Sequence, residues 1–78
     1  MDYEATDRYM SSWVVSCVKD GTRFFLTYEG LATDMLGRAR VYRWEDEARG
    51  ECLYQRGENW GAGFAWKPMR TAEAEANR

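Results

Sequence analysis

The 78 residues of this chain are too few for two independent cores, so we expect a single domain. The composition, 45% hydrophobic and 15% aromatic, is too apolar for a disordered chain, and four Trp, five Tyr and three Phe supply most of the area for a core. The formal net charge of −2 excludes a strong overall field of either sign, which argues against binding nucleic acid by charge alone.

Two strand-like segments near the N-terminus predict a β-hairpin. Residues 1–11 show no regular period, and we expect them to form a loose arm ahead of a folded core over residues 12–70. Runs rich in β-branched and aromatic residues follow over 13–18 and 23–28, on either side of Asp20-Gly21. Asp-Gly favours a type I′ turn, because both central residues of that turn need a positive φ.

The turn fixes the register of the hairpin. A two-residue turn pairs Lys19 with Thr22, and strand alternation then places every second residue on a common face. The pairs on that face, which we expect to form the core, are Trp13 with Tyr28, Val15 with Leu26, and Cys17 with Phe24. The opposite face is mixed and carries Val14, Ser16, Val18, Arg23, Phe25 and Thr27.

The middle of the chain predicts a short turn, a third strand and a helix. Thr33 or Asp34 can cap a single helical turn that ends at Gly37, and residues 40–43 are typical of a short strand. The helix is expected over residues 44–56, with acids in its first turn and a glycine at its C-terminus. Its expected buried stripe is Trp44, Ala48, Cys52 and Leu53, and Gly50 is consistent with a close approach to the sheet.

A last strand is expected over residues 64–67, and Pro68 confines its end to a sheet edge because proline lacks an N–H. The polar tail over 71–78 is expected to fray. The predicted fold class is therefore α+β. It is a small antiparallel sheet of three to four strands, made of the N-terminal hairpin, the short third strand and a C-terminal edge strand, with one helix packed on one face.

Residue types that catalysis or metal binding needs are scarce. The chain has no His, which removes the commonest general base and the commonest metal ligand. Its serines have no base within sequence reach, and the acids at 45–47 spread around a helix start. Cys17 and Cys52 are too few and too far apart for a disulfide framework or a zinc knuckle, so we expect two reduced core residues. We predict no enzyme activity, no cofactor and no metal.

The N-terminal sequence bears on where the protein acts. Met1-Asp2-Tyr3-Glu4 is acidic where a signal peptide is basic, and no long apolar stretch follows. We therefore expect a cytoplasmic protein with no membrane partner.

The chain has more large rings than its predicted core accommodates. The core residues are expected to be Trp13, Phe24, Tyr28, Tyr42, Trp44 and Trp66. The rings left outside this core include Phe25 on the mixed hairpin face, Tyr54 on the outer side of the helix and Trp60 in a loop. Rings beside Arg are typical of binding hot spots, and nine of the eleven basic residues are Arg. The predicted partner-binding residues are Phe25, Arg38, Arg40, Arg43, Tyr54 and Trp60.

Two structural alternatives compete with this interpretation. Phe25 can instead meet the N-terminal arm, and Trp60 can fold over the end of the helix. The arginines can equally be a solvated strand edge.

The order of these segments resembles a type of small protein encoded by phages and mobile elements. The resemblance covers about two thirds of the chain, through the hairpin over 13–28, Thr33-Asp34, Ala39-Arg40-Val41-Tyr42 and Glu45-Asp46-Glu47-Ala48. The best-known class among these proteins is the anti-CRISPR inhibitors, which occlude a nucleic-acid-binding surface of a CRISPR effector complex. Nine Arg set this chain apart from the strongly acidic DNA mimics of that class and favour steric occlusion.

The resemblance implies a non-enzymatic inhibitor that docks on a large protein or ribonucleoprotein complex, a type I CRISPR effector above all, and blocks target-DNA binding. The alternative is a small phage nucleic-acid-binding domain that uses Arg38, Arg40 and Arg43. An edge strand over 64–67 also leaves a homodimer open.

Overall fold

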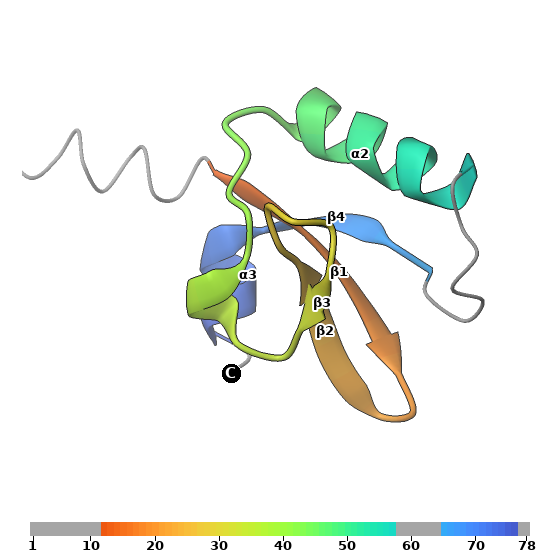
Figure 1. Cartoon of the computed structure of the whole chain (residues 1–78). Helices are drawn as coiled ribbons and strands as arrows, with labels where there is room; N and C mark the ends of the chain where they lie inside the picture. Colours follow the sequence, from red (N-terminus) through yellow and green to blue (C-terminus); the bar gives the residue numbers. More distant parts are fainter. Residues whose placement is uncertain (1–11, 58–64, 77–78) are drawn as a thin grey trace, which may run out of the picture.

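The computed structural model describes residues 12–57 and 65–76 and confirms a small α+β fold (Figure 1). In chain order the elements are β1 (Trp13–Lys19), β2 (Thr22–Leu26), β3 (Ala32–Thr33), the 3-10 turn η1 (Leu36–Arg38), α2 (Glu45–Gly57), β4 (Lys67–Arg70) and α3 (Thr71–Ala76). The strands form one antiparallel sheet in the order β3-β2-β1-β4. The predicted arm over 1–11 and the loop that carries Trp60 lie outside the described residues.

The predicted hairpin is confirmed at its turn. Lys19 pairs with Thr22 and Cys17 pairs with Phe24, as the two-residue turn requires. Both turn residues have a positive φ, 54° at Asp20 and 81° at Gly21. These angles are those of a type I′ turn, whose twist matches the twist of the two strands.

At the open end of the hairpin the predicted pairing is wrong. β2 ends at Leu26, and the chain then turns away, so Tyr28 does not lie opposite Trp13. Tyr42 takes that place, because Trp13 N donates to Tyr42 O over 2.8 Å and Tyr42 N donates to Trp13 O over 2.7 Å. The strand predicted over 40–43 is therefore one isolated bridge, and the third strand along the chain is β3, beside β2.

The helix prediction is confirmed to within one residue at each end, and α2 covers one face of the sheet (Figure 1). Ala48 and Cys52 of α2 are buried in a cluster with Val15, Cys17, Leu26, Tyr42 and Trp66. Both cysteines are thus reduced core residues, as predicted, and neither forms a disulfide.

The buried stripe of α2 is narrower than predicted. Trp44 and Leu53 are each 59% exposed. Trp44 lies just before the helix and its carbonyl accepts the bond from Ala48 N over 3.3 Å, so its side chain does not follow the helical stripe. A Cβ added at Gly50 would meet nothing within 4 Å, so this glycine does not mark a close approach to the sheet.

The second face of the sheet is also buried, and here the prediction of a single core face is wrong. Val14 and Phe25 pack with Met69 of β4, Ala74 of α3 and Ala39, which follows η1. The tail that was predicted to fray forms α3, and Thr71 N at its start donates to Ser12 O over 3.0 Å. The sheet therefore lies between α2 on one side and α3 with η1 on the other (Figure 1).

The last strand begins three residues later than predicted. β4 spans Lys67–Arg70 and includes Pro68, which lies opposite Val15. The strand order makes β4 an edge strand, which is where proline is tolerated. The prediction that Pro68 lies at a sheet edge is confirmed.

Candidate binding surface

A tight turn after β2 positions two apolar side chains at the surface. Thr27 organises it, because Thr27 N donates to Leu31 O over 2.9 Å and Leu31 N donates to Thr27 Oγ1 over 3.0 Å. Gly30 has a φ of 82° and its N–H donates to Thr27 O over 3.1 Å. Tyr28 and Leu31 are consequently held outward, 67% and 65% exposed.

Arg40 connects this turn to the rest of the molecule. Its backbone N donates to Leu26 O over 2.9 Å, at the end of β2. Its guanidinium carbon lies 4.7 Å from the centroid of the Tyr42 ring and 5.6 Å from that of Tyr28, both within cation–π range. Arg40 Nη1 also lies 3.9 Å from Glu51 Oε1 of α2. The guanidinium is therefore fixed between a buried ring, an exposed ring and a carboxylate.

A hollow adjoins the exposed ring. It has a volume of about 530 Å³, and its lining comes from the turn, from β3 and from η1: Thr27, Tyr28, Glu29, Leu31, Ala32, Thr33 and Arg38. We call Tyr28, Leu31, Arg38 and Arg40 the arginine–aromatic surface. It combines two guanidinium groups with two exposed apolar side chains, which is the chemistry of a protein-binding hot spot.

A second cation–π pair lies where α2 begins. The guanidinium carbon of Arg43 is 5.5 Å from the Trp44 ring centroid, and the Trp44 side chain is largely exposed. The backbone N of Trp44 donates to Glu47 Oε1 over 3.4 Å, which resembles a capping box. Trp44 thus serves as the helix cap and presents its ring to solvent.

Burial changes the acidity of the phenol beneath Arg40. Tyr42 is 4% exposed, and its hydroxyl has no hydrogen-bond partner among the described residues. Desolvation, reinforced by the negative charge of Glu51 and opposed by Arg40, raises the pKa of Tyr42 to about 12. Tyr42 therefore stays neutral and holds Arg40 through its ring face.

The structure places the predicted binding residues in different settings. Arg38, Arg43 and Tyr54 are exposed, and Arg40 is half-buried. Phe25 is 4% exposed and packs against Met69 and Ala74, so the expectation of an exposed ring there is wrong. Trp60 lies outside the described residues. Tyr54 lies one turn from Glu51 on α2, the residue that Arg40 contacts.

The sequence analysis places Tyr28 and Trp44 in the core, but the structure exposes both rings at the surface. A local signal existed for each. Tyr28 immediately precedes Glu29-Gly30, a turn sequence, and Trp44 immediately precedes the acidic first turn of α2. Residues at such boundaries leave the period of the element, so the period does not predict their burial.

Reactive chemistry is sparse over residues 12–57 and 65–76. Within those ranges no group of three or more His, Cys, Asp or Glu side chains is arranged to hold a metal ion. Cys17 is buried, and desolvation raises the pKa of its thiol despite the nearby charges of Arg23 and Lys19. A raised thiol pKa leaves less of the nucleophilic thiolate at neutral pH.

Comparisons with known proteins give no assignment. No family model, curated protein or solved structure matches the chain. Over the described residues, none of the helices has the length and apolar character needed to cross a bilayer.

Proposed function

We propose that this chain is a non-enzymatic binding protein that docks on a larger protein or ribonucleoprotein complex through the arginine–aromatic surface. The observation that carries the proposal is the fixed guanidinium of Arg40, packed against the exposed ring of Tyr28 and bridged to Glu51. A side chain that is already ordered loses little conformational freedom on binding, so more of its contact energy contributes to affinity.

An interface of ordinary size needs only part of the surface of this chain. A standard protein interface covers roughly 800 Å² on each partner. That is about one seventh of the 5617 Å² accessible surface of the chain. The hollow beside Tyr28 can receive a partner side chain, and the two arginines can bind its carbonyl or carboxylate oxygens.

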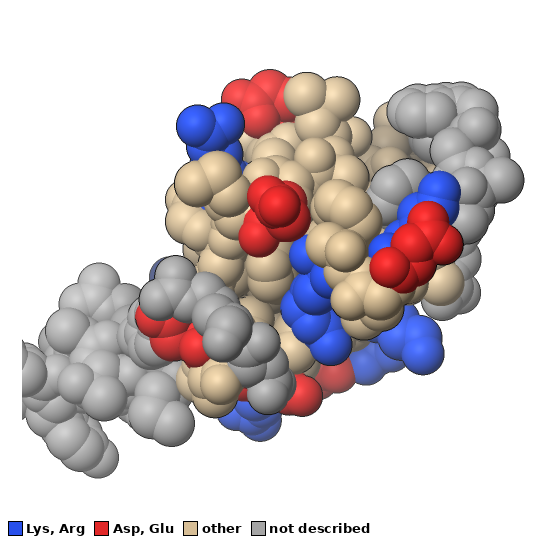
Figure 2. Space-filling model, turned by 90° about the horizontal axis from the view of Figure 1, so that it is seen from below, with Lys and Arg blue, Asp and Glu red and all other residues tan. Residues whose placement is uncertain are grey.

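The partner we test first is a type I CRISPR effector complex. The order of the hairpin, the Ala39-Arg40-Val41-Tyr42 segment and the acidic helix start resembles small phage proteins, of which anti-CRISPR inhibitors are the best-known class. The proposed mechanism is steric, since the bound chain covers the surface on which the effector holds target DNA. Charge mimicry of DNA is not part of it. On the face in Figure 2, basic and acidic side chains are interspersed, with no continuous acidic area.

The experiment measures both binding and inhibition with purified type I effector complexes. The chain is expected to co-elute with the effector in size-exclusion chromatography and to reduce its target-DNA binding in a gel-shift assay. Tyr28→Ala and Arg40→Ala are each expected to weaken effector binding by roughly 30-fold, as a hot-spot residue worth about 2 kcal/mol does.

Arg49→Ala is the matched control. Arg49 is an exposed arginine on α2 that contacts Glu45 one turn away, and it lies outside the arginine–aromatic surface. Its loss is expected to leave affinity within about twofold, since exposed ion pairs contribute little. Unchanged affinity in both Tyr28→Ala and Arg40→Ala would show that the surface is wrong. Absence of any complex with type I effectors would show that the partner is wrong.

A second candidate function is nucleic-acid binding, which the exposed Arg38 and the Arg43–Trp44 pair favour. Rings and guanidinium groups stack on unpaired bases. Glu51 contacts the neighbouring Arg40, and the acids at 45–47 follow Arg43 closely along the chain, so these carboxylates weaken the attraction for phosphate. A labelled single strand distinguishes the two functions, because retardation that falls steeply with salt supports nucleic-acid binding.

A further inference from the structure

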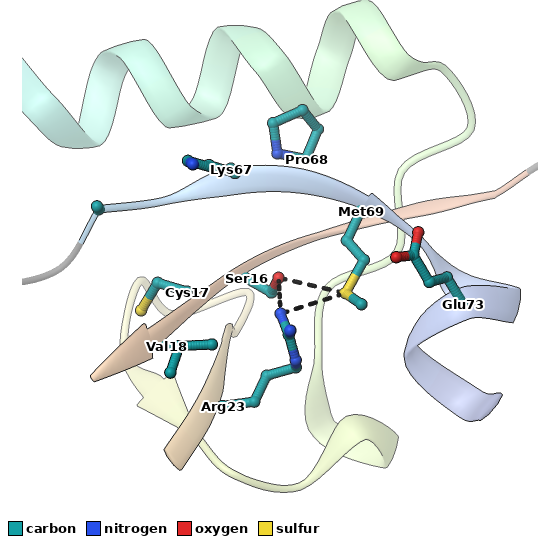
Figure 3. Close-up of a pocket in the computed structure, with 9 residues that line it drawn as sticks. Ser16, Cys17, Val18, Arg23, Lys67, Pro68, Met69 and Glu73 are labelled. Atoms are coloured by element: carbon teal, nitrogen blue, oxygen red, sulfur yellow. Dashed lines mark hydrogen bonds between the residues drawn. The ribbon is translucent and has the colours of Figure 1, made fainter. Parts of the chain in front are cut away.

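A pocket on the α3 side of the sheet contains an arginine that the proposed function does not use. The pocket has a volume of about 390 Å³ and lies between the end of β1, the start of β2, β4 and α3 (Figure 3). Its lining combines two cations and one carboxylate, Arg23, Lys67 and Glu73, with the apolar groups of Val18, Ala65 and Met69.

Among the described residues, the hydrogen bonds of the Arg23 guanidinium all involve a single nitrogen, Nη1. Arg23 Nη1 donates to Ser16 Oγ over 3.1 Å and contacts Met69 Sδ at 3.5 Å, and the Ser16 hydroxyl in turn donates to Met69 Sδ over 3.4 Å. Ser16 is 3% exposed and Met69 is 7% exposed, so the anchor is rigid. Figure 3 shows the three side chains converging from β1, β2 and β4.

The rest of the guanidinium has no partner within residues 12–57 and 65–76. In the described part of the chain, no carboxylate lies within ion-pair distance of Arg23, and its Nε and Nη2 have no hydrogen-bond acceptor. Arg23 is half-buried. A guanidinium presents five donors in a planar fork, and Nε with Nη2 is an edge that matches the two oxygens of a carboxylate.

Sheet register adds a second cation. Arg23 lies opposite Val18, and Lys67 lies opposite Ser16, so both project from the same face of the sheet as Ser16, on the strands either side of β1. Across the described residues Lys67 has no carboxylate within 4.0 Å. Two cations therefore border the pocket, against the single carboxylate of Glu73.

We propose that this pocket binds a small organic carboxylate. Nε and Nη2 of Arg23 donate to the two carboxylate oxygens, Lys67 supplies the second positive charge, and the apolar part of the ligand packs against Val18 and Met69. The volume falls within the range of small-molecule sites, and the apolar wall with a few convergent polar groups is their usual composition. The site lies on the opposite side of the sheet from α2 and is separate from the arginine–aromatic surface.

The test is an NMR titration of the ¹⁵N-labelled chain with sodium benzoate at constant ionic strength, with sodium phosphate and sodium chloride as parallel probes. Benzoate is expected to shift the amides of Ser16, Cys17, Val18, Lys67 and Met69 saturably, with a dissociation constant in the millimolar range. Arg23→Gln is expected to weaken binding by roughly 10- to 100-fold, as the loss of a charge-assisted pair of hydrogen bonds does.

Two further variants sharpen the result. Arg49→Gln removes an exposed guanidinium on α2, on the other side of the sheet from the pocket, and is expected to leave benzoate binding unchanged. Lys67→Gln keeps the Ser16–Arg23–Met69 anchor intact and is expected to weaken binding about threefold by loss of one exposed charge. If Arg23→Gln does not fold, the benzoate affinity of Lys67→Gln still tests the proposal.

Three outcomes overturn the proposal. One is shifts that grow linearly with benzoate without saturating. Another is equal shifts with chloride at the same ionic strength. The last is an affinity that neither Arg23→Gln nor Lys67→Gln changes. Saturable binding of phosphate in place of benzoate overturns the carboxylate assignment as well.

Discussion

The hydroxyl of Tyr42 is buried beneath α2 without a hydrogen-bond partner in the described part of the chain. A buried polar group in that state costs about 1–3 kcal/mol relative to its hydrated form. The ring itself contributes in two ways, through burial in the cluster of Val15 and Cys52 and through its contact with Arg40. The residue therefore stabilises the fold by its ring and destabilises it by its oxygen.

Tyr42→Phe separates these two effects. The substitution keeps the ring and the Arg40 contact and removes the unpaired oxygen, so we expect the free energy of unfolding to rise by about 1 kcal/mol at pH 7. Chemical denaturation followed by circular dichroism measures the change. Tyr28→Phe, which removes a hydroxyl from a 67% exposed side chain, is the control and is expected to have no effect beyond about 0.5 kcal/mol. A less stable Tyr42→Phe variant would mean that the hydroxyl has a partner.

The same substitution alters stability in alkali. The pKa of Tyr42 is raised to about 12 in the folded chain, against about 10 in the unfolded chain, so folding favours the neutral phenol. The contribution of this pKa difference to the free energy of unfolding is fully present below pH 10 and is lost as the pH rises to 12. The loss reaches about 2 kcal/mol at pH 12. Tyr42→Phe removes this contribution, so its unfolding free energy falls less steeply between pH 10 and 12 than that of the wild type.

At the scale of elements, the hairpin and α2 form from local signals. Asp20-Gly21 adopts the positive φ values that its sequence predicts, and the acids at 45–47 lie in the first turn of α2. These signals act over a few residues, so no knowledge of the rest of the chain is needed to interpret them. The bridge between Trp13 and Tyr42 has no such signal, because it joins residues that are far apart along the chain.

Two glycine substitutions test how much backbone conformation contributes to these elements. A Cβ added at Gly21 or at Gly50 meets nothing within 4 Å, so crowding is equal and only the backbone differs. Gly21 has a φ of 81°, and Gly21→Ala is expected to lower the unfolding free energy by about 1 kcal/mol. Gly50→Ala, within α2, is expected to raise it by about 1 kcal/mol through helix propensity. Thermal and urea denaturation measure both, and equal signs would contradict the argument.

At the scale of the whole molecule, α3 makes the sheet the middle of three layers. Ala74 is 1% exposed and packs in the cluster of Val14 and Phe25, and Thr71 anchors the start of α3 to Ser12. Six residues that are rich in Ala and Glu are too few to form a stable helix alone. The contact with the sheet is therefore what stabilises α3.

Ala74→Asp tests whether α3 is part of the core. A carboxylate at this buried position is expected to lower the unfolding free energy by about 3 kcal/mol or more, since it loses hydration without gaining a partner. Ala76→Asp places the same charge on the exposed side of the same helix and is expected to change stability by less than about 0.5 kcal/mol. Equal stability of the two variants in urea denaturation would show that α3 is not packed on the sheet.

Part of the candidate site was predictable from the sequence, and part depended on distant segments of the chain. The sequence identified Arg38, Arg40, Arg43 and Tyr54 as surface residues from composition and position, and the structure places all four at least partly in solvent. Phe25 was misassigned because strand alternation gives two faces without saying whether the second one is covered. That depends on α3 and Met69, which come more than forty residues later in the chain.

The sequence by itself determined the α+β class, the type I′ hairpin and its register at the turn, the extent of α2 and the burial of both cysteines. Each follows from residue spacing or from the φ preference of one or two residues. Only the tertiary structure decided which rings are exposed, that Tyr42 takes the place opposite Trp13, and that Arg23 donates to Ser16 through Nη1 on the second face of the sheet. The physical reason is that burial and pairing depend on which distant segment covers a surface, and local propensities do not encode that.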